Sequence, residues 1–352
     1  MYKYILHKLL YGFLVLLGVI LVVFTLFNIL PVDPARLTLG QRADVESVEA
    51  INKELGLDKP KSVQFFLYLN DLSPVSIYAN TDQAQIQYNY LKLIPFGDNV
   101  LVLKKPYLRR SFQTKEDVIT KLLSKFPSTL LLAISSIILA ILIGIPLGIF
   151  AALKHNSWFD NLAMSISVLG ISVPSYVSAM LLSFLFGYLW NRYTGLEQTG
   201  SLFMIDDYGN DVLVLKNLIL PTIALGTRPV AIIFQLTRST MLDILSHDYI
   251  RTARAKGLSE RWVIFKHALR NALNPVVTSI SGWFASLLAG AYFVEMIFNI
   301  DGIGSMTVNA LQTFDFPVVM GSVLFTASIF VCMNIFVDIL YGILDPRIRL
   351  AK

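Results

Sequence analysis

The sequence predicts an all-α polytopic membrane protein with six transmembrane helices and an α/β segment inserted between the first two. The mean hydropathy of the 352-residue chain is +0.62, and 55% of its residues are hydrophobic. Only 15% of the residues are charged, whereas a soluble domain has about 25%. Several apolar stretches also reach the length of ~18 residues or more that is typical of a helix crossing a bilayer.

The apolar stretches give six predicted spans. Each must be a helix, because an open strand would leave backbone groups without hydrogen-bond partners in lipid. The first stretch follows Lys3 and Lys8 and resembles a secretory signal, but it has no small-residue cleavage site, so we expect an uncleaved helix. The spans lie at about residues 9–30, 129–151, 162–190, 218–240, 275–298 and 317–343.

The short loops predict the orientation of the chain. Twelve Lys and Arg residues fall on the side of the N-terminus, and only Arg192 and Lys216 fall in the opposite short loops, 191–217 and 299–316. Because basic residues gather in cytoplasmic loops, we expect both termini in the cytoplasm. The net charge of +5 is therefore no indication of nucleic-acid binding.

Residues 31–128 are then expected outside the cytoplasm, since long loops are translocated regardless of their charge. Residues 46–56 have the apolar spacing of a helix that ends at Gly56. Residues 85–103 alternate loosely, as short strands do, and residues 114–126 predict an amphipathic helix that leads to the second span.

The predicted domains follow from these boundaries. They are an N-terminal helix (1–30), an extracytoplasmic domain (31–128), a five-helix core (129–343) with the cytoplasmic loop 241–273, and a cytoplasmic tail (344–352).

The sequence lacks the residues that nucleotide hydrolysis requires. A P-loop needs Gly-Lys followed by Ser or Thr, and the chain has no Gly-Lys dipeptide. The four histidines lie in separate segments without an HExxH pair, and the single cysteine, Cys332, lies in an apolar stretch. We therefore expect a non-catalytic chain that binds no metal and no cofactor of its own.

Few ionisable residues lie within the predicted spans, where a charge is costly and usually functional. Arg228 is expected deepest, and two interpretations are open for it: a residue that lines a translocation pathway, or a packed or snorkelling arginine. Glu295, near the outer end of the fifth span, is the second pathway candidate. Arg238 and Asp338 lie near the inner interface, where a structural role is expected.

The cytoplasmic loop 241–273 has the pattern of two short helices joined by a turn. Ile250, Ala253 and Gly257 share one face, and Gly257 is placed to end the first helix. Trp262 and Phe265 then lie on the apolar stripe of a second helix. Orientation requires only charge, so it does not explain these small residues, whereas a compact helix suits insertion into a groove on a partner protein.

This loop resembles the coupling loop of ABC importer permeases. The general motif there is Glu-Ala-Ala, three residues, then Gly; aligned on Gly257, the first three positions are Arg251, Thr252 and Ala253. The stretch "YIRTARAKG" followed by "HALRNALNPVV" is similar to the oligopeptide, dipeptide and nickel permease subfamily, as are "LPVDPA", "ELGLDKP", "LGISVPSY" and "LYGILDPRIR". The resemblance covers about residues 1–69 and 108–352, so residues 70–107 are interpreted as an insertion.

The resemblance implies a type I ABC importer permease fold and a set of partners. A second homologous permease subunit would pair with this chain, two ATPase subunits would bind ATP and Mg²⁺, and an extracytoplasmic binding protein would deliver the solute. The location implied is the bacterial cytoplasmic membrane. The residues expected to couple the chain to the ATPase are Arg251, Thr252, Ala253, Ala255, Gly257 and Leu258.

Import of di- and oligopeptides is the function that this resemblance favours. Nickel or another small solute is the alternative within the same subfamily. Two hypotheses from other classes are a gradient-driven carrier, disfavoured by the lack of acidic residues in the middle of the spans, and a membrane-anchored receptor, disfavoured by the presence of six spans.

Overall fold

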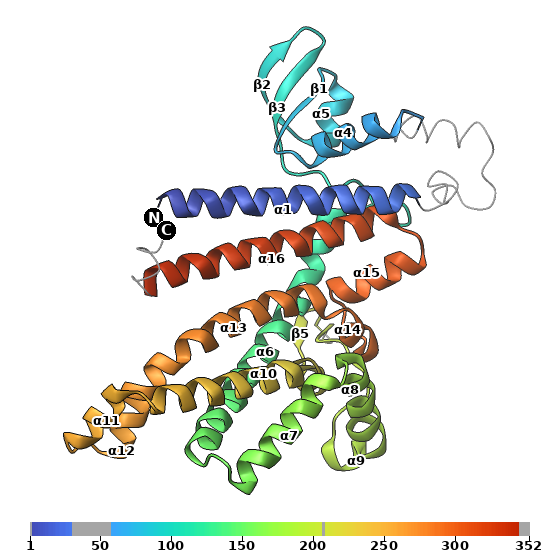
Figure 1. The fold of residues 1–352 in the computed structure, drawn as a ribbon. Helices are drawn as coiled ribbons and strands as arrows, with labels where there is room; N and C mark the ends of the chain where they lie inside the picture. The colour runs from blue at the N-terminus through green and yellow to red at the C-terminus, as the bar shows by residue number, and fades with distance from the viewer. Residues whose placement is uncertain (1, 30–57, 206–207, 345–352) are drawn as a thin grey trace. The chain divides into compact units, whose positions relative to one another are not determined.

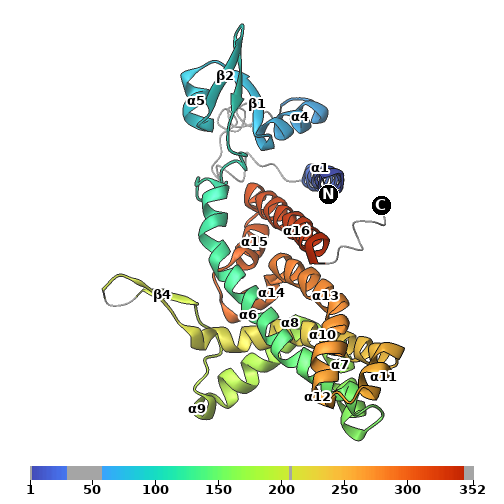
Figure 2. The ribbon, with the colours of Figure 1, turned by 90° about the vertical axis from the view of Figure 1, so that its left-hand side faces the viewer.

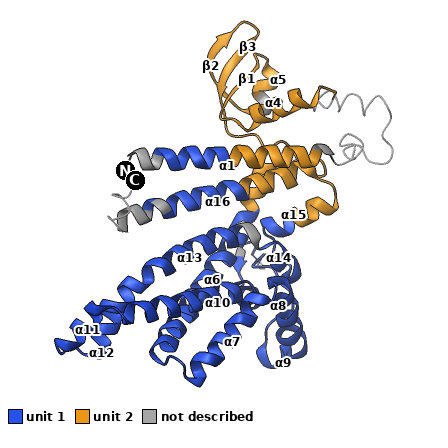
Figure 3. Ribbon diagram, viewed as in Figure 1, with its two compact units in different colours: residues 1–14, 125–306, 326–352 blue, residues 15–124, 307–325 orange. Residues whose placement is uncertain are grey.

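The computed structural model describes residues 2–29, 58–205 and 208–344 of the chain. Figure 1 shows the order of its helices and strands, and Figure 3 shows its two compact units. Unit 1 comprises residues 1–14, 125–306 and 326–352, and unit 2 comprises residues 15–124 and 307–325. The helix predicted at 46–56 and the tail beyond residue 344 lie outside the described residues.

Unit 1 contains most of the helices. They include α7 (Trp158–Ser172), α8 (Ser175–Leu182), a π-helical turn (Ser183–Leu189), α9 (Asn191–Thr194), a 3-10 turn (Leu215–Leu218), α10 (Ile219–Leu245), α11 (Asp248–Ala255), α12 (Glu260–Trp262), a second π-helical turn (Val263–Ala268), α13 (Leu269–Gly290) and α14 (Tyr292–Phe298), together with the hairpin of β4 (Phe203–Ile205) and β5 (Asp211–Leu213).

Four of the described helices contribute residues to both units. These are α1 (Tyr2–Ile29), α6 (Val118–Leu153), α15 (Ile303–Gln312) and α16 (Phe316–Leu344). Helix α6 begins in the amphipathic segment and continues through Pro127 and Pro146. The amphipathic helix expected at 114–126 and the second span therefore form one continuous helix that begins at Val118.

In the described part of the chain, four helices are long and apolar enough to cross a membrane, and two bent pairs raise the number to six if each pair is one span. The prediction of six spans agrees with the larger number. The third span is not straight, however, because α7 and α8 meet at an angle of 103°. Val173 and Pro174 have extended backbones at this break, which is the conformation that a proline favours for the residue before it.

Helix α10 is the centre of unit 1. Figures 1 and 2 show it beside α13 and α7, and it also packs against α8 and α14. On α6, Gly148 allows a close approach, since a Cβ atom there would lie 2.6 Å from Cβ of Thr237 and 2.9 Å from the carbonyl oxygen of Phe234. The buried core of the unit runs from Leu132 of α6 through Ile233 of α10 to Phe298 of α14.

Unit 2 holds the small sheet of the inserted segment. Its elements are α4 (Lys61–Leu72), β1 (Val75–Ala79), α5 (Asp82–Tyr88), β2 (Leu91–Phe96) and β3 (Asn99–Leu103), and the antiparallel strand order is β1-β3-β2. The strand expected in "NVLVL" is confirmed as β3, but the stretch before it is helical as far as Tyr88, so only the second part of the expected 85–94 strand forms β2.

Candidate functional site

The candidate coupling helix, α11, begins after a two-residue turn at the end of α10. Its C-terminus is closed by Gly257, which has a φ of +76°. The amide of Gly257 donates to the carbonyl of Arg254 at 2.9 Å, and the amide of Leu258 donates to that of Ala253 at 3.4 Å. This is the Schellman pattern, so the predicted turn at Gly257 is confirmed. A Cβ atom at Gly257 would meet nothing within 4 Å, so the glycine serves the backbone conformation.

One face of α11 packs against its own chain. Ile250 is fully buried and Ala253 is 7% exposed, and both lie in a cluster with Met241 of α10, Val263 and Ile264. We expected Ala253 to present a compact surface to a partner, and that expectation is wrong for this structure. Its small side chain instead lets α11 pack closely on the π-helical turn that follows α12.

The opposite face of α11 is exposed to solvent. The predicted coupling residues Arg251, Thr252, Ala255 and Leu258 are all exposed. Arg254 is engaged, because its Nη2 lies 2.7 Å and its Nε 3.2 Å from the carboxylate oxygens of Glu260 beyond the turn. Three of the six predicted coupling residues, Arg251, Thr252 and Ala255, thus lie on the exposed side of α11, Ala253 packs on the other side, and Gly257 and the exposed Leu258 follow the end of the helix.

The second helix of the loop differs from its predicted pattern. Trp262 is 52% and Phe265 is 61% exposed, whereas Val263, Ile264 and Ala268 are buried. The π-helical turn at Val263–Ala268 changes the helical phase, so the stripe expected from regular spacing does not face the chain's own core.

The two pathway candidates lie in different surroundings. Arg228, near the middle of α10, is exposed, and its Cζ lies 6.0 Å from the centre of the Trp283 ring of α13. Among the described residues, no acidic side chain forms an ion pair with Arg228.

Glu295 is instead fully buried. Its Oε1 accepts a hydrogen bond from the Thr129 hydroxyl at 2.7 Å, and its Oε2 accepts one from the Ser305 amide at 3.0 Å. Thr129 in turn accepts from the Ile303 amide at 2.9 Å. The carboxylate thus joins α6, α14 and the start of α15. A Cβ atom at Gly302 would collide with this carboxylate, so the turn before α15 is shaped around it.

Sequence reasoning missed the partners of this carboxylate and a second buried acid, Asp160, at the start of α7. Asp160 is 1% exposed and forms an ion pair with Arg238 of α10. The local signal was the spacing Ser157-x-x-Asp160, which is typical of a helix N-terminus. Within the described part of the chain, no group of three or more His, Cys, Asp and Glu side chains is arranged to hold a metal ion.

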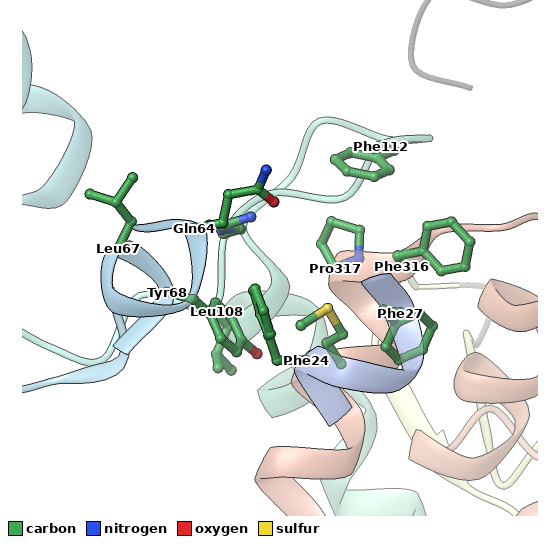
Figure 4. Close-up of a pocket in the computed structure, with 11 residues that line it drawn as sticks. Phe24, Phe27, Gln64, Leu67, Tyr68, Leu108, Phe112, Phe316 and Pro317 are labelled. Carbon is green, nitrogen blue, oxygen red and sulfur yellow. The ribbon is translucent and has the colours of Figure 1, made fainter. Parts of the chain in front are cut away.

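A pocket lies within unit 2, and Figure 4 shows the residues around it. It is mostly aromatic: the rings of Phe27 and Phe316 are 5.0 Å apart, and Phe24 stacks on Tyr68 at 6.0 Å. Its basic member, Arg109, is engaged with Asp71 at 3.3 Å. The lining residues are Phe24, Phe27, Gln64, Leu67, Tyr68, Leu108, Arg109, Phe112, Phe316, Pro317 and Met320, and none of them is a predicted coupling or pathway residue.

Comparison with known proteins decides the family. The model described as "Binding-protein-dependent transport system inner membrane component" matches residues 144–350, and the N-terminal model of the same system matches residues 1–133. The chain belongs to this family. It is a multi-pass permease subunit of an ABC transport system, as the resemblance of its coupling loop predicted.

Several curated relatives match over nearly the whole chain. The dipeptide transport system permease protein DppB of Alkalihalophilus pseudofirmus is 36% identical over 363 residues, covering 99% of this chain and 100% of the relative. DppB of Escherichia coli K12 is 35% identical, covering 96% and 95%. The glutathione transport system permease protein GsiC of Salmonella typhimurium is 36% identical, covering 99% of each.

The fold also resembles a solved transporter. An inward-facing structure of the MetNI methionine ABC transporter matches with a TM-score of 0.51 and 16% identity, covering 64% of this chain and 97% of the other. At this identity the match concerns the fold alone.

Proposed function

We propose that this permease subunit belongs to an ATP-driven importer of di- and oligopeptides and forms half of its translocation pathway. The relatives are permeases of dipeptide and glutathione transport systems by name, which supports a peptide substrate. The observation that carries the coupling role is α11, a short helix packed on α10 with an open face of Arg251, Thr252 and Ala255, followed by the exposed Leu258.

The chain acts without covalent chemistry of its own. ATP and Mg²⁺ are bound by two partner ATPase subunits, a second homologous permease completes the pathway, and an extracytoplasmic binding protein supplies the peptide. The twelve basic residues on one side against two on the other support cytoplasmic termini in a bacterial cytoplasmic membrane. The open face of α11 would then meet the ATPase in the cytoplasm.

Coupling in this scheme is a shift between two populations of the permease. ATP-driven closure of the ATPase subunits displaces α11, and the displacement must favour the outward-open over the inward-open arrangement. Since Ile250 and Ala253 are buried against α10 and the following π-helical turn, a displacement of α11 must also displace α10 and that turn.

Arg228 is the residue that we assign to the pathway. It is exposed near the middle of an apolar helix, where an ionisable side chain most often serves a solute or an ion. Glu295 has its carboxylate fully engaged with protein donors, so we assign it to the support of the pathway wall and not to direct contact with peptide.

The test is co-purification of the permease with its ATPase. The variant Gly257→Val puts a β-branched residue at a φ of +76°, at a cost of about 1–2 kcal/mol, and changes the turn that closes α11. We expect it to lose most of the bound ATPase while the permease still inserts in the membrane. ATPase binding at the wild-type level, together with normal peptide uptake, would refute the role of α11.

A matched control separates this effect from general strain. Gly209 has a φ of +82° and, like Gly257, has nothing within 4 Å of an added Cβ atom, but it lies in the β4–β5 hairpin. Gly209→Val should therefore carry a similar strain and retain the ATPase.

A further inference from the structure

A buried ion pair joins α7 to α10. Arg238 of α10 donates from Nε to one carboxylate oxygen of Asp160 at 2.5 Å and from Nη2 to the other at 2.7 Å. The side chain of Asp160 is 1% exposed and that of Arg238 is 16% exposed. Two parallel bonds from one guanidinium to one carboxylate fix both the distance and the orientation of the two groups.

The turn before α7 holds this carboxylate in place. The backbone amide of Asn156 donates to Oδ2 of Asp160 at 3.0 Å, and the Ser157 hydroxyl accepts from the Asp160 amide at 3.3 Å. His155 adds a contact of 3.1 Å between its Nδ1 and Nη2 of Arg238. The aspartate therefore belongs rigidly to the start of α7, and its charge is directed at α10.

The segment of α10 that carries Arg238 leads along the chain to the candidate coupling helix, α11. Arg238 precedes the first residue of α11, Asp248, by ten residues, which is about 15 Å along a helix. Met241, one turn after Arg238, packs in the same cluster as Ile250 of α11. A displacement of α11 is therefore passed to the part of α10 that holds the arginine.

We propose that Arg238 and Asp160 are positioning residues that make α7 follow α10 when α11 is displaced. The inference rests on the proposed function of α11. Apolar packing between helices in lipid has no hydrophobic driving force, and packed helices can shear past one another by small sliding displacements. The ion pair prevents this sliding, because separating the two groups would strand a buried charge. One further hydrogen bond, from Gln235 to the Ser167 hydroxyl at 2.9 Å, extends the same contact along both helices.

The test uses the whole complex in proteoliposomes, with its ATPase and binding protein. The double variant Asp160→Asn with Arg238→Gln removes both charges and keeps side chains of similar size. We expect the number of peptides taken up per ATP hydrolysed to fall at least about fivefold, the lower end of typical coupling effects, with the ATPase still bound. A merely structural pair would lower the amount of complex and leave this ratio unchanged, and an unchanged ratio overturns the proposal.

A second variant covers the case in which the double variant does not assemble. Arg238→Lys keeps the charge and loses the two-pronged geometry, so a reduced ratio is expected here as well, and a wild-type ratio overturns the proposal. Glu197→Gln is the matched control, since its ion pair with Lys216 is exposed at both ends (56% and 47%) and has a separation of 3.6 Å. It should leave the ratio unchanged.

A second measurement does not depend on the substrate. Cys332 is replaced by serine, and the exposed Asn161, in the first turn of α7 and outside the predicted span, is replaced by cysteine. Reactivity of this cysteine toward a maleimide should change between ATP-free and vanadate-trapped complex, and the change should be lost in Arg238→Lys. Failure of wild-type complex to import peptide would refute the proposed function, whereas an ATP-dependent change that persists in Arg238→Lys would refute the positioning role.

Discussion

Among the described residues of unit 1, the buried carboxylates of Asp160 and Glu295 are stabilised in different ways. Asp160 faces the guanidinium of Arg238, so its negative charge is balanced by a positive one. Glu295 has neutral donors, the Thr129 hydroxyl and the backbone amides of Ser305 and Gly304, and no basic side chain of the described residues forms an ion pair with it. The first acid faces a guanidinium, with His155 Nδ1 also 3.3 Å from its Oδ2, and the second depends on a network of neutral donors that spans three helices.

The difference between the two carboxylate sites indicates how each one connects the helices around it. The ion pair connects two helices at one point, which suits a contact that has to be held while both helices move. The Glu295 network connects α6, α14 and the start of α15 at once, where backbone amides at a helix N-terminus favour a negative group. We therefore interpret the Glu295 site as a contact that holds three helices in place, and the Asp160 site as a contact that is kept while α7 and α10 move together.

The largest effect is expected when the cation of the ion pair is removed alone. Arg238→Gln leaves Asp160 without its guanidinium, and the loss of one partner of a fully buried ion pair typically costs about 3–5 kcal/mol. Because Arg238 is 16% exposed and His155 Nδ1 lies 3.3 Å from the carboxylate, we expect the lower end of this range, about 3 kcal/mol. The double variant that also neutralises Asp160 should recover most of this cost, because no charge is then stranded. Thermal unfolding midpoints of the purified permease in one detergent measure the loss in the single variant and the recovery in the double variant. Equal midpoints for the single and double variants would contradict a charge-balanced site.

A smaller effect is expected when Glu295 is neutralised. Glu295→Gln keeps the size of the side chain and strands no charge, but its amide nitrogen replaces one of two acceptors. One donor, on Thr129 or Ser305, is left without a partner, at a cost of about 1–3 kcal/mol. The midpoint should therefore fall less than in Arg238→Gln. A larger fall would show that Glu295 has an ionic partner and would remove the distinction between the two acids.

Much of the fold follows from the sequence because the membrane imposes it. Hydropathy alone gives the six spans, and the turn at Gly257 is predictable because a Schellman ending depends on local backbone conformation. The bend of 103° between α7 and α8 was not predicted, although Pro174 marks its place. Hydropathy measures how apolar a segment is and not whether it is straight.

For the candidate site, the sequence could predict only the features that depend on neighbouring residues in the chain. The exposure of Trp262 and Phe265 follows from the π-helical turn at Val263–Ala268, and regular spacing gives no sign of such a turn. The role of Glu295 depends on Thr129, which lies 166 residues away in the chain. Both are properties of tertiary packing, so a charge count over the spans could identify Glu295 as unusual without identifying its partners.

The smallest effect concerns a buried cation in unit 2, where a third way of accommodating a charge is found. Lys104 is 6% exposed and donates to the carbonyl oxygen of Asp71. Its Nζ lies 5.6 Å from the ring centre of Tyr78 and 6.0 Å from that of Tyr88, and these two rings stack on each other at 4.1 Å. Burial lowers the pKa of Lys104 from 10.5 to about 8, against the opposing charge of Asp71. This lysine therefore gives up its proton more readily in the folded chain than in the unfolded chain.

The sign of the pH effect follows from the two pKa values. Between pH 8 and 10.5 the unfolded chain holds the proton more tightly, so the sheet should become more stable as the pH rises, by at most about 1.4 kcal/mol per unit. Below pH 8 both states are protonated, and this contribution no longer changes with pH. Hydrogen exchange of β1 and β3 in the full-length permease, corrected for the intrinsic rate, measures the trend. The variant Lys104→Met should abolish it, and a trend that survives in that variant would assign it to another group.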